Sequence, residues 1–164
     1  MLHSVIITNS QGILLLSQYF GGGCEAWDAE GASARASWER RLWAIGSPWV
    51  NQGQGSQIKE PVDGVNMIDQ WTVVWCSYGD FIIFLSGNDE YDELILANEI
   101  LPIVCALLNE HCEKKLTENV LLRGDIYGKV TISLEEMVRD GHLFHTSLDA
   151  ILKMSKMRKS TPTT

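Results

Sequence analysis

Few residues of this chain have the type and spacing that catalysis would require. Gly21-Gly22-Gly23 lies between a predicted strand and a predicted helix, but the Lys-Ser/Thr pair of a P-loop and the G-x-G-x-x-G order are both missing. No serine stands in a G-x-S-x-G elbow. Cys105 would act as a nucleophile only if His111 or His142 reached it, and Cys105 falls on a helix that is predicted to be buried. We therefore predict no catalytic residues, no cofactor and no enzymatic activity.

The cysteines and histidines do not have the spacing of a metal site either. No C-x-x-C or H-x-x-x-H pattern occurs, and His142 and His145, three residues apart in a predicted loop, have no companion ligand nearby in the sequence. No secretory signal is apparent, so we interpret the four cysteines as reduced thiols of the core rather than as a disulfide framework. They are Cys24, Cys76, Cys105 and Cys112.

The charge of the chain limits its partners. With 13 basic and 21 acidic residues in 164 positions, the net charge is −8, and such a chain lacks the basic surface that nucleic acids and anionic membranes select. We interpret the two small basic groups, Lys114-Lys115 and Lys153–Lys159, as solvated helix ends and tail. We expect no nucleic-acid partner, and any association with a membrane should be indirect.

The opening residues, MLHSVIITNSQGILLLSQYF, predict a β-hairpin. A signal peptide would carry Arg or Lys ahead of its apolar core, yet the first Arg or Lys is Arg35. The polar tetrad Asn-Ser-Gln-Gly at 9–12 divides the apolar residues into two runs that are too short to span a membrane. We expect paired strands at Leu2–Thr8 and Ile13–Phe20, joined by a turn.

An amphipathic helix is predicted to follow, over Cys24–Ile45. Its apolar positions recur at steps of three and four and form one stripe. These positions are Trp27, Gly31, Ala34, Trp38, Leu42 and Ile45. Gly46 is predicted to cap the helix and Pro48 to prevent its resumption. The Gly- and Gln-rich segment Gly46–Glu60 has no periodicity and is predicted to be a flexible loop.

Three further strands are expected at Val62–Ile68, Trp71–Tyr78 and Phe81–Ser86. The last two are apolar with little alternation, which indicates a sheet that is covered on both faces. Helices should therefore lie on both sides of it. Because β-α-β alternation is absent, the predicted fold class is α+β with a five-stranded antiparallel sheet.

The C-terminal half is predicted to be helical. Glu90–His111 has helical periodicity, with a kink or break at Pro102. Thr117–Arg139 also fits a helical stripe, although two glycines weaken it and Ile126–Ile132 alone would pass as a strand. A last short helix is expected to run through Met157. The predicted order is ββ-α-βββ-α-α plus this C-terminal helix, and residues 158–164 are predicted to form a disordered tail.

This order and several local stretches resemble the longin-type small subunits, sigma and zeta, of vesicle-coat adaptor complexes. The opening MLHSVIITNSQG is similar to their first strand and turn, and Ser77-Tyr78-Gly79 with Phe81–Leu85 is similar to their last hairpin. Further likenesses follow in order along the chain: Asn88-Asp89, Leu107–Glu113, Tyr127-Gly128-Lys129-Val130, Leu134-Glu135-Glu136-Met137, Gly141-His142-Leu143, Thr146-Ser147 and Ile151-Leu152-Lys153. The resemblance implies one longin-like domain at residues 1–157 and favours a helix over Thr117–Arg139.

The extended Gly/Gln loop and the Trp-rich first helix fit a divergent member of this family. The chain looks like the longin-like small subunits of TSET-type complexes, such as the plant TPLATE endocytic complex. The resemblance implies a non-enzymatic subunit that binds the solenoid of a large adaptor-like subunit. Its complex would be cytoplasmic, peripheral at the plasma membrane or on coated vesicles, and active in clathrin-mediated endocytosis. A longin-type regulatory subunit of a membrane tether or exchange-factor complex is the alternative.

Sigma subunits of clathrin adaptors also recognise acidic dileucine signals through an apolar pocket, and they carry basic residues in the second strand, where this chain has Ile13–Gln18. The positions that align near that pocket are Asp80, Leu101, Glu110 and His111. Three of these four are polar or charged, and their desolvation would be costly. We predict that the chain does not bind a dileucine peptide.

Two tryptophans, Trp43 and Trp49, are candidates for contact with a partner. At about 100° per residue, Trp43 falls opposite the apolar stripe of the first helix, and Trp49 follows beyond the predicted turn. Exposed tryptophan is enriched at interface hot spots because it contributes a large apolar area with few rotors. Two interpretations stay open for Trp43: contact with a large subunit, or packing under the Gly46–Glu60 loop of its own domain.

Overall fold

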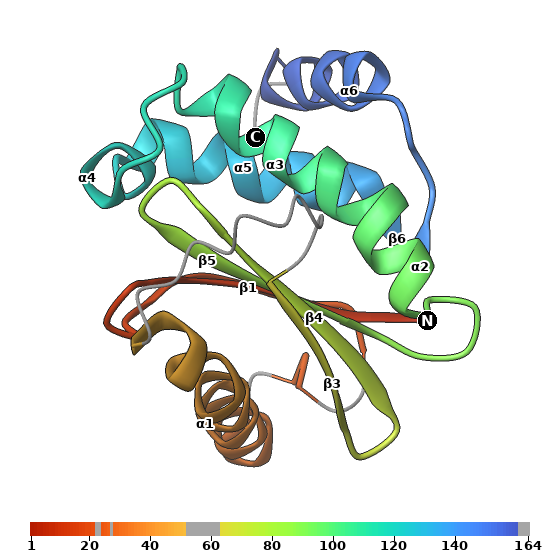
Figure 1. Cartoon of the computed structure of the whole chain (residues 1–164). Coiled ribbons are helices and arrows are strands. Elements are labelled where there is room, and N and C mark those ends of the chain that lie inside the picture. The colour runs from red at the N-terminus through yellow and green to blue at the C-terminus, as the bar shows by residue number, and fades with distance from the viewer. Residues whose placement is uncertain (22–23, 27, 52–62, 161–164) are drawn as a thin grey trace.

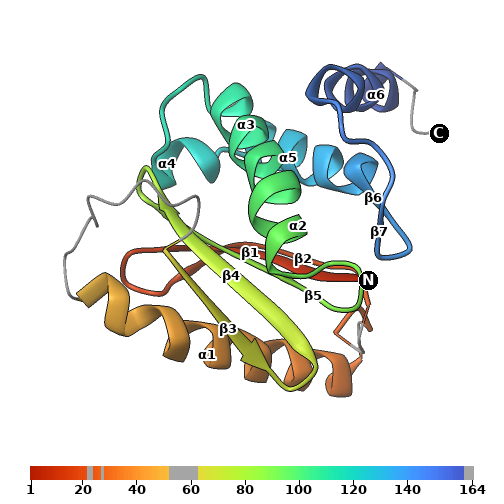
Figure 2. The same cartoon turned by 45° about the vertical axis from the view of Figure 1, so that its right-hand side comes forward.

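A sheet with helices on both faces forms the centre of the molecule (Figure 1). The computed structural model describes residues 1–21, 24–26, 28–51 and 63–160, apart from the side chains of 47–51 and 158–160. Helix α1 covers one face, and the helices of the C-terminal half cover the other (Figure 2). The predicted α+β class and the covering of both faces are confirmed.

The sheet has five antiparallel strands in the order β2-β1-β5-β4-β3. They are β1 (Leu2–Asn9), β2 (Leu14–Tyr19), β3 (Gly64–Ile68), β4 (Trp71–Tyr78) and β5 (Phe81–Gly87). All five predicted strands are present, and β4 has the predicted bounds. The predicted start of β3 at Val62 lies outside the described residues. Strands β2 and β3 are the two edges of the sheet.

The predicted β1–β2 hairpin is confirmed, and Asn9 holds its turn. The Asn9 Oδ1 atom accepts hydrogen bonds from the backbone N–H groups of Gln11 and Ile13, at 2.9 Å each. Gly12 has a φ of +84°, a conformation that favours glycine. Past the turn, Thr8 pairs with Leu14 and Ile7 with Leu16. Leu15 is therefore an extra residue in β2, a β-bulge.

Helix α1 (Ala29–Asn51) packs its apolar stripe on one face of the sheet. Trp38 and Leu42 are buried there against Val73, Trp75 and Phe84. The stripe is confirmed at its described positions, whereas the predicted Trp27 lies outside them. The Trp38 Nε1–H group also donates to Ser4 Oγ at 3.1 Å, so the largest side chain of the stripe satisfies its polar atom.

The predicted start of this helix at Cys24 was wrong. The Asp28 carboxylate accepts a hydrogen bond from the Gly31 N–H at 2.8 Å and caps the first turn. The segment before it folds back, and the Arg35 guanidinium holds the carbonyls of Cys24 and Ala26. A side-chain cap therefore places the start of α1 at Ala29.

The predicted end of this helix was also wrong, because α1 continues through Gly46 and Pro48 to Asn51. Gly46 serves close packing rather than capping: a Cβ atom at this position would lie 2.8 Å from Cζ of Phe84. Pro48 falls in the last turn, so only three helical residues follow the position at which its missing N–H removes a backbone hydrogen bond. The first six residues of the predicted loop are thus helical, and its remainder, 52–60, lies outside the described residues.

The opposite face is covered by a continuous helical run over Glu93–His111. It consists of α2 (Glu93–Ile95), a π-helical turn η1 (Leu96–Ile100) and α3 (Leu101–His111). A kink or break was predicted at Pro102, but the run continues there and changes helix type just before it, since proline has no N–H for the preceding turn. By length and composition alone the run could cross a membrane, but it buries its apolar side in the core against the sheet.

The continuous helix predicted over Thr117–Arg139 was wrong. The chain forms α4 (Glu118–Leu121) and α5 (Gly124–Met137), and its last two residues form β6 (Val138–Arg139), paired with β7 (His142–Leu143). The strand considered at 126–132 is also excluded. The last helix, α6 (Leu148–Ser160), extends three residues beyond the predicted end and into the predicted tail. Residues 161–164 of that tail lie outside the described chain.

Candidate functional site

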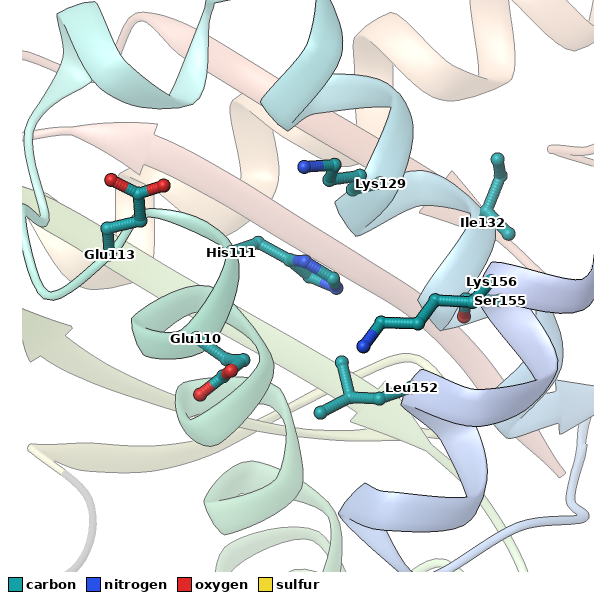
Figure 3. Close-up of a pocket in the computed structure, with 8 residues that line it drawn as sticks. All are labelled: Glu110, His111, Glu113, Lys129, Ile132, Leu152, Ser155 and Lys156. Atoms are coloured by element: carbon teal, nitrogen blue, oxygen red, sulfur yellow. The ribbon is translucent and has the colours of Figure 1, made fainter. Parts of the chain in front are cut away.

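A cavity of about 190 Å³ opens between the C-terminal end of α3 and the middle of α5 and of α6 (Figure 3). Its lining residues are Glu110, His111, Glu113, Lys129, Ile132, Leu152, Ser155 and Lys156. In Figure 3 the His111 ring lies in the middle of these side chains. Pockets for drug-sized ligands usually measure roughly 300–1,000 Å³. This cavity is therefore small for a cofactor.

A chain of hydrogen bonds beside the cavity joins the three helices. The His111 Nε2 atom lies 2.8 Å from Ser133 Oγ, and Ser133 Oγ lies 3.2 Å from Ser155 Oγ. Ser155 donates its hydroxyl proton to the Ile151 carbonyl at 2.7 Å. Because each hydroxyl has one proton, Ser133 must donate to Ser155, and His111 must donate to Ser133.

This direction of donation is opposite to that of a catalytic Ser–His pair. In such a pair the serine donates to histidine, which then takes the proton as a general base. Here the Nε2 atom of His111 already carries a proton, and the Ser133 side chain is fully buried. Ser133 cannot reach a substrate in this state. The arrangement is a structural link between α3, α5 and α6.

Cys105, the cysteine considered as a nucleophile, contacts the thiol of Cys76 instead of a histidine. Two causes raise the pKa of the Cys76 thiol well above its usual value: the hydrogen bond with Cys105, which has the larger effect, and burial. Cys76 therefore remains protonated at neutral pH. All four cysteines are free, and three of them are buried, in agreement with reduced core thiols.

The two histidines considered for metal binding contact different partners. His142 lies in β7 rather than in the predicted loop, and its Nδ1 is 3.4 Å from the Glu90 carboxylate. The His145 ring packs edge-on against Phe144. Across the described residues, no group of three or more His, Cys, Asp or Glu side chains is placed to hold a metal ion.

The four positions aligned with the dileucine pocket are not gathered into one pocket. Leu101 is buried in the core at the start of α3, whereas Glu110 and His111 line the cavity at its end. Asp80 lies in the β4–β5 turn and borders a different hollow. Its backbone N–H donates to the Leu116 carbonyl at 3.0 Å. The absence of dileucine binding stays a prediction, because peptide binding has not been tested.

Trp43 is half-buried rather than fully exposed on α1. Its indole covers the β1–β2 turn, where a Cβ atom on Gly12 would lie 2.5 Å from the Trp43 ring. Beside it Ile13 and Leu14 are 54% and 40% exposed, which the hairpin prediction did not anticipate. Trp49 belongs to the last turns of α1, and its side chain lies outside the description. Contact of either tryptophan with a partner stays a prediction.

Comparison with known proteins finds a likeness that spans nearly the whole chain. The TSET complex member tstD of Dictyostelium discoideum is 27% identical over 164 residues, which is 99% of this chain and 96% of that protein. The fold is similar to that of a chain in a homology model of the full-length AP-3 complex in a stretched open conformation. That match has a TM-score of 0.61 and 16% identity, and it covers 97% of this chain and 94% of the other. No family model matches the sequence. The resemblance predicted from the sequence is confirmed.

Proposed function

We infer that this chain is a TSET-type relative of the adaptor small subunits, and we propose that it is a small, non-enzymatic subunit of a heteromeric adaptor-like complex. The observation that carries the proposal is the end-to-end alignment with the TSET complex member tstD. The buried Ser133–His111 link agrees with a structural role, because it joins helices and offers no accessible nucleophile. The partner that we propose is the solenoid of a large adaptor-like subunit.

Within this proposal, we assign the complex to clathrin-mediated endocytosis. The complex would act in vesicle trafficking from the cytoplasm, at the plasma membrane or on coated vesicles. A net charge of −8 disfavours direct attraction to anionic lipids. Other subunits would therefore supply the membrane contact, and this chain would contribute a rigid domain to the assembly.

Affinity purification of the tagged chain from its own cells tests the proposal. We expect large adaptor-like subunits in stoichiometric amounts, and slower uptake of a fluorescent endocytic tracer after depletion of the chain. Recovery of tether or exchange-factor subunits instead would contradict the adaptor assignment. Normal tracer uptake, with the large subunits present in the purification, would contradict only the endocytic assignment.

Trp43 is the first residue to examine at the proposed interface. Truncation of an interface tryptophan commonly costs about 1–2 kcal/mol or more, so Trp43→Ala should weaken association with the large subunit by about 5- to 30-fold. The fold should persist because the side chain is only half-buried. Binding can be measured by titration and folding by circular dichroism, and Trp49→Ala can be measured in the same way.

Trp38→Ala is the matched control for this measurement. Trp38 is 5% exposed and donates to Ser4, so its loss should destabilise the isolated domain by about 3–5 kcal/mol. Wild-type affinity of the Trp43→Ala chain, or its unfolding in isolation, would place the interface elsewhere.

A further inference from the structure

Strand β2 is an edge of the sheet, and among the described residues part of its outer side has backbone groups without a hydrogen-bond partner. The Phe20 N–H donates to the His3 carbonyl at 2.8 Å, and successive residues of an antiparallel strand face alternately toward and away from the paired strand. Leu16 and Gln18 therefore bond to β1, whereas Ser17 and Tyr19 direct their N–H and C=O groups outward. No strand lies on that side, and in the described part of the chain no turn or loop amide bonds to these groups.

Two adjoining hollows follow this edge. One, of about 450 Å³, is lined by Ser17, Gln18, Tyr19, Cys24, Glu25, Arg35, Tyr127, Thr131 and Glu135. The other, of about 340 Å³, is lined by Thr8, Gly12, Leu14, Ala36, Glu39, Arg40 and Trp43. They meet where the Tyr19 hydroxyl donates to the Glu39 carboxylate at 2.7 Å, because Tyr19 lines the first hollow and Glu39 the second. We call the two together the β2 channel.

The β2 channel has a helix on each side. On α5, Tyr127, Thr131 and Glu135 are spaced by four residues and so share one face. On α1, the wall is formed by the turn that carries Ala36 and Arg40. Figure 2 shows β2 between these two helices. A bound helix would leave the outward groups of β2 unpaired, because its own backbone is already hydrogen-bonded. An extended chain would pair with them.

The side chains of the β2 channel indicate what such a chain should carry. Leu14 is 40% exposed and lies beside the indole of Trp43, so this end offers an apolar socket. Arg40 is exposed at the rim of the same hollow. An apolar side chain next to an acidic one complements this end. At the other end the exposed Glu25 complements a basic side chain.

We propose that an extended segment of the large subunit adds to β2 as a sixth strand and places an apolar side chain in the socket between Leu14 and Trp43. The proposal rests on the proposed function, which supplies the large subunit. Backbone pairing is confined to Leu16–Tyr19, because the bulge at Leu15 interrupts the regular strand. This mode of recognition takes its affinity from main-chain hydrogen bonds and its specificity from the side-chain socket.

Amide hydrogen exchange of the purified complex and of the free chain tests the proposal directly. The amides of Ser17 and Tyr19 should exchange at least about tenfold more slowly in the complex. Those of Val65 and Met67 on the other edge strand serve as the internal reference. Unchanged exchange at Ser17 and Tyr19 in the complex would overturn the proposal. Protection that appears in the free chain and grows with its concentration would also overturn it, in favour of a second copy.

Ser17→Pro is the matching variant, with Ser17→Ala as its control. Proline removes only the outward N–H, is accepted on edge strands, and leaves the bonds to β1 in place. We expect about tenfold weaker binding of the large subunit by Ser17→Pro and normal binding by Ser17→Ala, which keeps the N–H. Equal affinities of the two folded variants would contradict strand addition.

A second pair of variants tests the socket if Ser17→Pro does not fold. Leu14→Glu should weaken binding by about tenfold or more, because a carboxylate would face an acidic segment in an apolar site. Met67→Glu, on the exposed opposite edge, should bind normally. If Leu14→Glu and Met67→Glu weaken binding of the large subunit equally, the proposal is overturned.

If no large subunit co-purifies with the wild-type chain, both the proposed function and this proposal fail. If it does co-purify but β2 stays unprotected, only this proposal fails.

Discussion

At the scale of single residues, His3 shows how the aromatic cluster holds a titratable ring in the core. The ring is stacked on Trp71 with centroids 4.3 Å apart and lies edge-on to Trp38 at 4.7 Å. Its Nδ1–H donates to the Gly21 carbonyl at 2.8 Å. Burial lowers the pKa of His3 below its usual value, because desolvation disfavours the charged imidazolium.

This shift predicts that the domain loses stability in mild acid. The unfolded chain takes up a proton at His3 near pH 6.5, whereas the folded chain does so only at lower pH. The stability contribution is therefore complete above about pH 6.5 and falls as the pH decreases below it. His3→Gln should reduce the difference between the unfolding free energies at pH 7.5 and pH 5.5, measured with urea. Equal pH dependence of the wild-type and His3→Gln chains would contradict the argument.

At the scale of elements, the strands could be predicted because each apolar run is bounded by turn-forming residues near its ends. The ends of α1 could not, because they depend on contacts distant in sequence. From the sequence alone, a glycine at position 46 is typical of a helix cap. In the structure, Gly46 instead allows α1 to pack closely against Phe84. The Ser133–Ser155 link was missed for the same reason, since it joins helices that are separated along the chain. The resemblance correctly excluded a strand at 126–132, but it predicted neither the break between α4 and α5 nor the short strand β6 at the end of the segment.

Two glycines on helices should respond oppositely to the same substitution. Gly128→Ala on α5 should stabilise the domain by about 0.5–1 kcal/mol, because nothing lies within 4 Å of the added Cβ atom and alanine favours a helix. Gly46→Ala should destabilise it by about 1–3 kcal/mol, because the Cβ atom would meet the buried Phe84 ring. Urea unfolding of both variants measures the contrast. Stabilisation by Gly46→Ala would mean that α1 shifts away from Phe84 without cost.

At the scale of the whole molecule, several large apolar side chains remain outside the core. Among the described residues, the exposed large apolar side chains lie on several elements and on the turns and loops between them: Ile13, Leu14, Val65, Met67, Leu94, Leu122, Tyr127, Phe144 and Met157. Single exposed apolar residues are ordinary on soluble proteins. Leu14 and Tyr127 differ from the others because they line the β2 channel beside an edge strand, and the two features together favour association.

The isolated chain should therefore associate with itself or unfold at a lower temperature than the assembled complex. A partner that binds only the folded chain stabilises it by about 2.7 kcal/mol at a concentration 100 times its Kd, so the difference should grow with the concentration of the large subunit. Light scattering of the free chain over a range of concentrations, and thermal unfolding with and without the large subunit, measure the two effects. A monodisperse free monomer whose unfolding temperature does not change when the large subunit is added would contradict its role as a subunit. The exposed apolar residues around β2 would then be ordinary surface, because a surface that evolved to be covered should gain stability when it is covered.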